Sequence, residues 1–355
     1  MDYKSVDPNL VVADTIETSD MDFYDIMDAP FEIYGVYYSE EDGRFARMPK
    51  SDAIKVNEGV NFLRTQTAGG RIRFRCNSDE YAIITKQPYC HKSAMMSSEI
   101  TAGFDIYVDG VYNRTFSPGN VEENGGYQAR LTMERHQDKM SDILIHMPPY
   151  GDVSGVLVGV KKGSKIEKPT PYNDMKPIVF YGSSITQGAA ASRPGNIYQN
   201  ILSRRLNFDY INLGFAGNCK AEPEMADYIN TLDMSVFVFD YDHNAKTPDD
   251  LKATHEPFFK MIREKNPDLP IVLMSRPLYL LNEPEKERLA HIKDVYERAR
   301  KSGDENVYFV DGSKTAENYG KHDATVDGVH PNDLGFYGIA EKLEAVFEKI
   351  FEKMD

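Results

Sequence analysis

Tryptophan is absent from this sequence, cysteine occurs only three times, and no apolar stretch is long enough to cross a bilayer. A membrane-spanning helix needs about 20 consecutive apolar residues, so we expect no segment of this chain to span a membrane. The three thiols belong to Cys76, Cys90 and Cys219. One disulfide, Cys76–Cys90, is conceivable and would leave Cys219 over, but we expect three reduced thiols.

Positive charge is also scarce: 41 Lys and Arg face 56 Asp and Glu, which gives a formal net charge of -15. Such a surface repels phosphate backbones and anionic lipid headgroups, which argues against nucleic acid and a membrane surface as partners. The N-terminus, MDYKSVDPNLVVADTIETSD, lacks the basic and apolar regions of a signal peptide. We therefore expect either a cytoplasmic protein or an exported one whose signal has been removed.

The first half of the chain has the pattern of an antiparallel β-sandwich. Short runs of β character alternate with turn signals such as Glu41-Asp42-Gly43 and Asn124-Gly125-Gly126. A stretch rich in Lys and Pro, near residues 162–176, is typical of an exposed linker. The expected strands cover residues 31–38, 71–76, 81–85, 104–108 and 142–146.

The second half alternates strands with helices. Apolar segments such as SVFVF (235–239) indicate strands that are buried on both faces, as in a parallel sheet covered by helices. Five such units predict a three-layer α/β/α domain. The expected strands are 177–181, 210–213, 235–239, 271–275 and 307–310, and the expected helices are 194–206, 249–265, 284–301 and 334–353.

Doubly wound sheets bind ligands at the carboxyl ends of their strands, so candidate site residues should follow the strands directly. After the first strand, YGSSITQG (181–188) presents Ser184 at a strand-to-helix turn. By itself, such a serine is more often a helix N-cap than a nucleophile. The turn is not a G-x-S-x-G elbow, because Thr186 occupies the place of the second glycine, and it lacks the glycine spacing and lysine of a phosphate loop.

Three further segments carry polar groups after later strands. NLGFAGN offers Gly217 and DYDHNA offers Asn244, both of which are ordinary loop residues. DGVHPNDLG places Asp327 three residues before His330. A carboxylate at this spacing can fix the imidazole tautomer and leave the other ring nitrogen to accept a proton from a hydroxyl.

Taken in order, the blocks GSSIT, NLGFAGN, DYDHN and DGVH resemble the signature of the SGNH hydrolase superfamily, the GDSL-type esterases and lipases. The resemblance covers residues 176–355 and implies a flavodoxin-like α/β/α fold. One departure is Ser183, which stands where the first block usually has Asp. That Asp has a supporting role, so the departure does not remove the implied activity.

A closer resemblance is carried by KPIVFYGSSITQGAAASRPGNIYQNILSRRL and by Gly103-Phe104-Asp105-Ile106-Tyr107. The second motif is similar to the G-x-D-L-Y motif that marks a subfamily with an added N-terminal domain. This resemblance implies a jelly-roll-like β-sandwich over residues 1–170, followed by the hydrolase domain over residues 176–355.

The resemblance also implies the roles of the site residues. Ser184 would be the nucleophile, His330 its general base and Asp327 the residue that orients the base. The oxyanion would be held by the backbone N–H groups of Ser184 and Gly217 and by the side-chain amide of Asn244. No metal ion and no organic cofactor is needed for this chemistry.

We expect the substrate to be a small-molecule or carbohydrate ester, with acetyl on a sugar as the first choice. No lipid-like apolar lid is visible in the sequence, and an appended β-sandwich often accompanies sugar-active enzymes, which is an argument from analogy. Arg193, in ASRPG, is a candidate substrate contact, and equally a surface arginine before a proline that begins a helix.

Three alternatives stay open. One is a lipase or thioesterase for longer acyl chains, and another is a glycan-binding protein with a relic triad, against which the intact triad argues. The third is a metal-dependent hydrolase, although the triad explains the same residues better. Its ligands would come from Asp240, Asp242, His243, His322, Asp323, Asp327 and His330.

Overall fold

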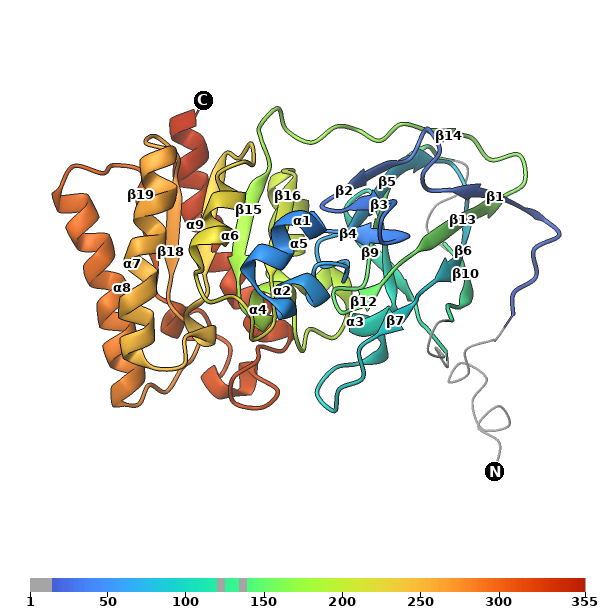
Figure 1. The fold of residues 1–355 in the computed structure, drawn as a ribbon. Coiled ribbons are helices and arrows are strands. Elements are labelled where there is room, and N and C mark those ends of the chain that lie inside the picture. Colours follow the sequence, from blue (N-terminus) through green and yellow to red (C-terminus); the bar gives the residue numbers. More distant parts are fainter. Residues whose placement is uncertain (1–14, 120–124, 134–138, 355) are drawn as a thin grey trace. The chain divides into compact units, whose positions relative to one another are not determined.

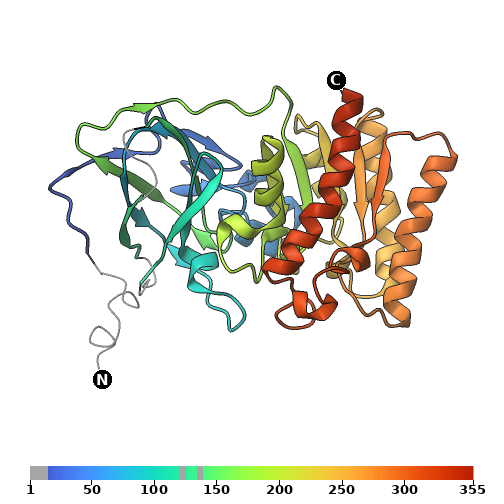
Figure 2. The ribbon, with the colours of Figure 1, turned by 180° about the vertical axis from the view of Figure 1, so that it is seen from behind.

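The computed structural model describes residues 15–119, 125–133 and 139–354 (Figures 1 and 2). The described residues form two compact units, and neither unit is a continuous stretch of chain. The sequence predicts a continuous division into residues 1–170 and 176–355. In the structure, residues 47–64 belong to the second unit and residues 192–195 belong to the first. Of the described residues, the first unit takes those within 15–46, 65–171 and 192–195, and the second takes those within 47–64, 172–191 and 196–354.

The first unit is an antiparallel β-sandwich. Its main strands are β1 (Met21–Asp25), β2 (Glu32–Tyr34), β5 (Arg71–Cys76), β6 (Glu80–Lys86), β8 (Phe104–Val108), β9 (Val111–Phe116), β10 (Gln128–Thr132), β11 (Ser141–His146), β13 (Gly155–Lys161) and β14 (Ile166–Glu167). One sheet has the order β1-β13-β6-β10, and the other has the order β14-β5-β11-β8-β9 with β2 paired to β5. Alternate side chains of both sheets form one apolar core, so the expected sandwich is confirmed.

Smaller elements complete this unit. They are the pairs β3 (Tyr37–Ser39) with β4 (Arg44–Ala46) and β7 (Tyr89–Cys90) with β12 (Gly151–Asp152), and the helix α3 (Ser98–Ala102). The single strand expected over 31–38 is divided into β2 and β3, because Gly35 has a φ of 74°, a left-handed conformation that ends the first strand. All three cysteines are free.

The second unit has a parallel sheet. Its strands are β15 (Ile178–Gly182), β16 (Tyr210–Gly214), β17 (Val236–Asp240), β18 (Ile271–Met274) and β19 (Val307–Val310). The order in the sheet is β16-β15-β17-β18-β19. The first strand along the chain, β15, therefore lies inside the sheet, and β16 lies at one edge. These strands agree with the expected ones to within one residue, since their apolar runs are buried on both faces.

Helices cover both faces of this sheet. They are α1 (Lys50–Val56), α2 (Glu58–Leu63), α4 (Ser184–Gln187), α5 (Tyr198–Leu206), α6 (Pro223–Ile229), α7 (Pro248–Lys265), α8 (Glu283–Lys301) and α9 (Asp333–Met354). Figure 1 shows α1, α6, α7 and α8 in front of the sheet, and Figure 2 shows α5 and α9 on the opposite face. The three-layer α/β/α class is therefore confirmed.

One expected helix begins later than predicted. Residues 194–196 form a single 3₁₀ turn, and α5 starts only at Tyr198. The helices α1 and α2 had no sequence-based prediction. None of the helices among the described residues has the length and apolarity needed to cross a membrane.

Candidate active site

The first site element is the sharp turn from β15 into α4. Ser183 is the N-cap of α4, and its hydroxyl oxygen accepts a hydrogen bond from the N–H of Ile185 at 3.2 Å. Its own N–H donates to the backbone oxygen of Asp240 at 3.2 Å. Thus Ser183, the residue that replaces the usual Asp, still fixes the turn. Ser184 follows it as the first residue of the helix, at the carboxyl end of the central part of the sheet.

The loop before α9 brings an imidazole to Ser184. The Ser184 hydroxyl oxygen lies 3.0 Å from His330 Nε2, and His330 Nδ1 lies 2.8 Å from Asp327 Oδ2. Because the carboxylate accepts the proton of Nδ1, Nε2 is left as an acceptor toward the hydroxyl. Of the three residues that the sequence predicts as a triad, His330 is therefore within hydrogen-bond reach of both Ser184 and Asp327.

Asp327 is itself held in place by backbone donors. Its Oδ1 accepts hydrogen bonds from the N–H of His330 at 2.7 Å and of Val329 at 3.0 Å. Partial burial raises its pKa, but these bonds and the imidazole outweigh burial and lower the pKa to about 2. The side chain is thus a carboxylate throughout the neutral and mildly acidic range.

Gly217 and Asn244 come from the loops after β16 and β17. Asn244 ends a 3₁₀ turn over Asp242–Asn244, and its Nδ2 donates to the backbone oxygen of Phe215 at 3.2 Å. Gly217 lies in the turn that follows Phe215, with a φ of 69° that favours glycine. The structure therefore joins the two loops through one hydrogen bond between them.

Asp242 anchors the 3₁₀ turn that carries Asn244. Its buried carboxylate accepts from the N–H of Arg276 at 3.0 Å and lies 3.2 Å from Arg288 Nη1. Burial raises the pKa of Asp242, but Arg276 and the neighbouring donors outweigh burial, so the pKa lies below its ordinary value. This ion-paired carboxylate holds in place the turn that carries Asn244.

Asp240, at the end of β17, is a buried acid that the sequence indicated only as a possible metal ligand. Its Oδ2 accepts from the hydroxyl of Thr186 at 3.0 Å and lies 3.4 Å from that of Tyr198. Among the described residues, its Oδ1 has no hydrogen-bond partner. Burial raises its pKa to about 8, so the group is protonated at neutral pH. In the sequence, Asp240 directly follows the apolar run VFVF, and this position was the signal that could have indicated its burial.

The residues of the metal alternative do not assemble into a site in the described parts of the chain. Those parts contain no group of three or more His, Cys, Asp and Glu side chains that could hold a metal ion. His243 is half-buried, and burial lowers its pKa to about 3, so the imidazole is neutral. Asp242 is engaged by arginines, and Asp327 and His330 by each other.

Arg193 lies in the first unit, together with the G-x-D-I-Y motif. Its Nη1 is 2.7 Å from Asp105 Oδ2 and 2.7 Å from the hydroxyl oxygen of Tyr107. The same Asp105 oxygen accepts from the N–H of Gly195 at 2.6 Å. Burial raises the pKa of Asp105, and Arg193 opposes that shift. The motif thus binds residues 193–195, a short segment that follows the nucleophile turn in the sequence.

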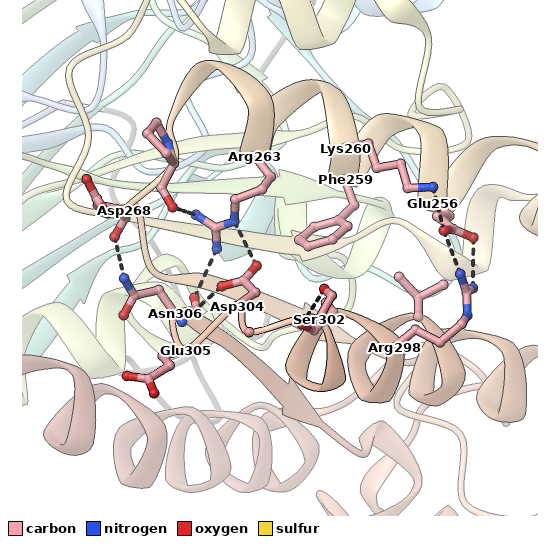
Figure 3. A pocket seen from close by; sticks show the side chains of 14 residues that line it. Glu256, Phe259, Lys260, Arg263, Asp268, Arg298, Ser302, Asp304, Glu305 and Asn306 are labelled. Atoms are coloured by element: carbon pink, nitrogen blue, oxygen red, sulfur yellow. Dashed lines mark hydrogen bonds and ion pairs between the residues drawn. The ribbon is translucent and has the colours of Figure 1, made fainter.

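Two cavities of the second unit contain no triad residue, and the smaller one has a single proposed site residue, Asn244, in its lining. A cavity of about 820 Å³ lies between α7 and α8 and contains no triad residue (Figure 3). Its arginines are engaged: Arg263 with Asp304 at 2.8 Å and Arg298 with Glu256 at 2.7 Å. A smaller cavity of about 230 Å³ is lined by Asn244. Its other lining residues are Lys220, Tyr241, Ala245, Lys246, Asp250 and Thr254.

Comparison with known proteins gives two family matches. Residues 175–348 match the GDSL-like Lipase/Acylhydrolase family. Residues 21–166 match the family described as the N-terminus of Esterase_SGNH_hydro-type, with the short name GxDLY. A search of curated proteins finds no match.

Several solved structures are similar over nearly the whole chain. A protein of Bacteroides ovatus described as a GDSL-like lipase is 28% identical, with a TM-score of 0.80, over 94% of this chain and 98% of that chain. The salicylyl-acyltransferase SsfX3 from a tetracycline biosynthetic pathway is 22% identical, with a TM-score of 0.75, over 93% and 99%. The acetyl xylan esterase Est2A from the rumen bacterium Butyrivibrio proteoclasticus is 13% identical, with a TM-score of 0.58, over 95% and 100%. At their low identity, the last two show the shared fold alone.

The chain belongs to the GDSL-type, or SGNH, hydrolases, in the subfamily with an N-terminal GxDLY domain. The resemblance stated from the sequence motifs is therefore confirmed. As a member of this family, the protein is a hydrolase that acts on ester bonds.

Proposed function

We propose that this ester hydrolase works through an acyl-serine intermediate, with Ser184 as nucleophile, His330 as general base and Asp327 as the residue that orients the base. The observation that carries the proposal is the unbroken chain of hydrogen bonds. It runs from the Ser184 hydroxyl to His330 at 3.0 Å and from His330 to Asp327 at 2.8 Å. Such an arrangement activates a hydroxyl that is a weak nucleophile by itself.

The reaction has two halves. Ser184 Oγ forms a bond to the carbonyl carbon as its proton passes to His330 Nε2, and His330 then returns the proton to the departing alcohol oxygen. Water next attacks the acyl-serine, His330 takes one of its protons, and the acid leaves as Ser184 recovers its proton. Asp327 stabilises the imidazolium in both halves, a role that its ionised state supports.

For the developing negative charge, we propose the N–H groups of Ser184 and Gly217 and the Nδ2 amide of Asn244 as donors. The amide nitrogen of Asn244 carries two hydrogens, and the bond to Phe215 uses one of them, so the other can face the substrate. One donor of this kind typically contributes about 2.7–4 kcal/mol to the stability of the transition state.

As substrate, we propose an acetyl ester of a carbohydrate. Proteins of the same fold include the acetyl xylan esterase Est2A and a family two carbohydrate esterase from Clostridium thermocellum in complex with cellohexaose.

The test compares p-nitrophenyl esters of increasing acyl length and then a panel of acetylated sugars, with released acetate as readout. We expect kcat/KM to be highest for the acetate ester and to fall with each lengthening of the chain. Turnover of esters of about eight carbons and longer alone would instead show a lipase, because a large apolar site gains about 0.8 kcal/mol per buried methylene.

A fluorophosphonate probe separates the enzyme from a glycan-binding protein with a relic triad. It should label the intact protein at one serine and leave Ser184→Ala unlabelled. An intact, folded protein that takes up no label would contradict the serine mechanism.

A further inference from the structure

Residues 47–64 belong to the second unit, although the sequence on either side of them belongs to the first. Figure 1 shows the corresponding helices α1 and α2, in blue, beside the green and yellow elements β16 and α6. α1 packs against α6, and Met48, Val60 and Leu63 are part of the same apolar core as Leu213. The N–H of Arg47 donates to the oxygen of Arg64 at 2.8 Å, which closes the base of the segment.

Arg47 binds the open edge of β16. Its buried guanidinium donates through Nη1 to the backbone oxygens of Asn212, at 2.9 Å, and Gly214, at 2.7 Å. Alternate carbonyl groups of an edge strand point away from the sheet and lack a strand partner. Nη2 donates to the oxygen of Leu63 at 2.7 Å, so Arg47 ties the edge strand to α2.

The same guanidinium lies over the ring of Phe215, with its central carbon 4.6 Å from the ring centroid. The backbone oxygen of Phe215 accepts the hydrogen bond from Asn244 Nδ2 at 3.2 Å. Phe215 therefore connects Arg47 with the amide of the proposed oxyanion hole. A shift of Phe215 would move the acceptor that orients Asn244.

A second contact lies on the other side of Gly217. Asn57 Nδ2 donates to the backbone oxygen of Asn218 at 3.0 Å and to Glu222 Oε1 at 2.7 Å. Gly59 lies so close to Asn218 that an added Cβ would stand 1.9 Å from its Oδ1. Contacts from residues 47–64 thus fix both neighbours of the turn, Phe215 before Gly217 and Asn218 after it.

We propose that the segment 47–64 positions the oxyanion hole: Arg47 and Asn57 fix the loop of Phe215–Asn218, and through it Gly217 and Asn244. Neither Arg47 nor Asn57 has a role in binding the substrate. The inference rests on the proposed function, because it takes Gly217 and Asn244 as oxyanion donors.

Small displacements here have large effects on rate. Oxyanion donors must lie about 2.7–3.1 Å from the oxygen that becomes charged. A misplacement of about 1 Å can reduce the rate by about 100-fold. The planar guanidinium reaches two carbonyls and a ring at once, which the point charge of a lysine does not reproduce.

The experiment uses the full chain with Arg47→Lys and, separately, Asn57→Ser. Serine keeps an acceptor for the N–H of Val60, which Asn57 caps at 2.8 Å, but lacks the amide that reaches Asn218. We measure kcat and KM for p-nitrophenyl acetate well below the thermal midpoint, and the midpoint itself.

The matched control is Arg263→Lys. Arg263 is a largely buried arginine of the same unit that pairs with Asp304 at 2.8 Å (Figure 3). It also donates to the backbone oxygens of Asn266 at 2.9 Å and Leu269 at 2.6 Å. It lies at the amino ends of β18 and β19, so its loss should lower the thermal midpoint and leave kcat within about twofold.

We expect Arg47→Lys to lower kcat about 10- to 100-fold and Asn57→Ser about 3- to 10-fold, with KM changed less than about threefold, because only transition-state contacts are displaced. Unchanged kcat in both variants, or a loss that follows the midpoint in the same way as Arg263→Lys, would overturn the inference. If Arg47→Lys fails to fold, Asn57→Ser decides alone.

A double-mutant cycle separates this inference from the proposed function. If Arg47 acts through Asn244, the loss caused by Arg47→Lys should shrink several-fold in an Asn244→Ala background, whereas independent effects multiply in full. A normal kcat for Asn244→Ala alone would contradict the proposed oxyanion hole. A low kcat for Asn244→Ala with full multiplication in the double variant would contradict only the role of Arg47.

Discussion

At both ends of the parallel strands a buried arginine binds backbone carbonyl groups, but the two ends differ in how completely their other polar groups are hydrogen-bonded. At the amino ends, Arg263 caps backbone carbonyls and pairs with Asp304 at 2.8 Å. At the carboxyl ends, Arg47 caps the carbonyls of β16, but among the described residues Asp240 Oδ1 and His243 Nε2 have no hydrogen-bond partner there. An end built for stability satisfies its polar groups, whereas an end that carries chemistry keeps some of them unsatisfied.

This comparison implies that substitutions of the proposed catalytic and oxyanion residues at the carboxyl ends reduce rate far more than stability. The strongest case is Ser184→Ala, which removes the proposed nucleophile and should lower kcat by about 10⁶-fold. We expect its free energy of unfolding to stay within about 1 kcal/mol of the parent, because only one hydroxyl is lost. Steady-state kinetics and urea denaturation measure both quantities. Residual activity above about a hundredth of the parent would rule out Ser184 as nucleophile.

Asp327→Asn should have the next largest effect. The amide keeps the shape of the carboxylate but no longer favours the imidazole tautomer with a proton on Nδ1, and the expected loss in kcat is about 10⁴-fold. KM should change little, since Asp327 is not proposed to contact substrate. Asp323→Asn, on the preceding 3₁₀ turn over Lys321–Ala324, is a matched control that should keep nearly full activity. Equal losses of kcat in the two variants would contradict the proposed role of Asp327 in orienting His330.

Asn244→Ala removes a single proposed oxyanion donor and should lower kcat about 10²- to 10³-fold. Asn244→Asp offers a sharper version, because a carboxylate of the same shape repels the oxyanion. We expect Asn244→Asp to be at least as slow as Asn244→Ala on p-nitrophenyl acetate. An Asn244→Asp variant that is faster than Asn244→Ala would contradict the proposed contact.

Asp240→Asn tests the unsatisfied acid and should change stability more than rate. Burial raises the pKa of Asp240 to about 8, whereas an aspartate in an unfolded chain titrates near 3.9. Between these values the folded state holds a proton that the unfolded state has lost, so the contribution of Asp240 to stability falls as pH rises from about 4 to about 8.

The asparagine cannot ionise, so the stability of Asp240→Asn relative to the parent should improve over that pH range by more than about 1 kcal/mol. Urea denaturation at several pH values measures the difference. Asp174→Asn, at an exposed position, is the control and should show no such trend. A difference between Asp240→Asn and the parent that is independent of pH would show that Asp240 is ionised in the folded protein.

The sequence predicts the second unit well because its signals are local. Each strand, such as Val236–Asp240, is a short apolar run, and each proposed site residue follows directly after a strand or before the last helix. The meeting of Ser184 and His330 at 3.0 Å spans 146 positions. No local pattern encodes that distance, and only the resemblance to a family predicts it.

Other features had no local signal. Residues 47–64 look like part of a β-rich half, and their place beside β16 depends on contacts such as Arg47 to Gly214 across 167 positions. The helix expected from residue 194 begins at Tyr198, because Gly195 is held by Asp105 at 2.6 Å instead of entering the helix. In both cases a tertiary contact overrides local propensity.

Residues 47–64 belong to the second unit although most of the first unit follows them in the sequence, and this has a consequence for biosynthesis. This stretch leaves the ribosome more than a hundred residues before the strands that it covers, so its apolar side chains must wait for their partners. The two units therefore cannot be completed one after the other in the order of translation. A gene fragment that starts after the linker would yield a sheet whose edge carbonyls at Asn212 and Gly214 lack their guanidinium, even though every proposed catalytic side chain is present.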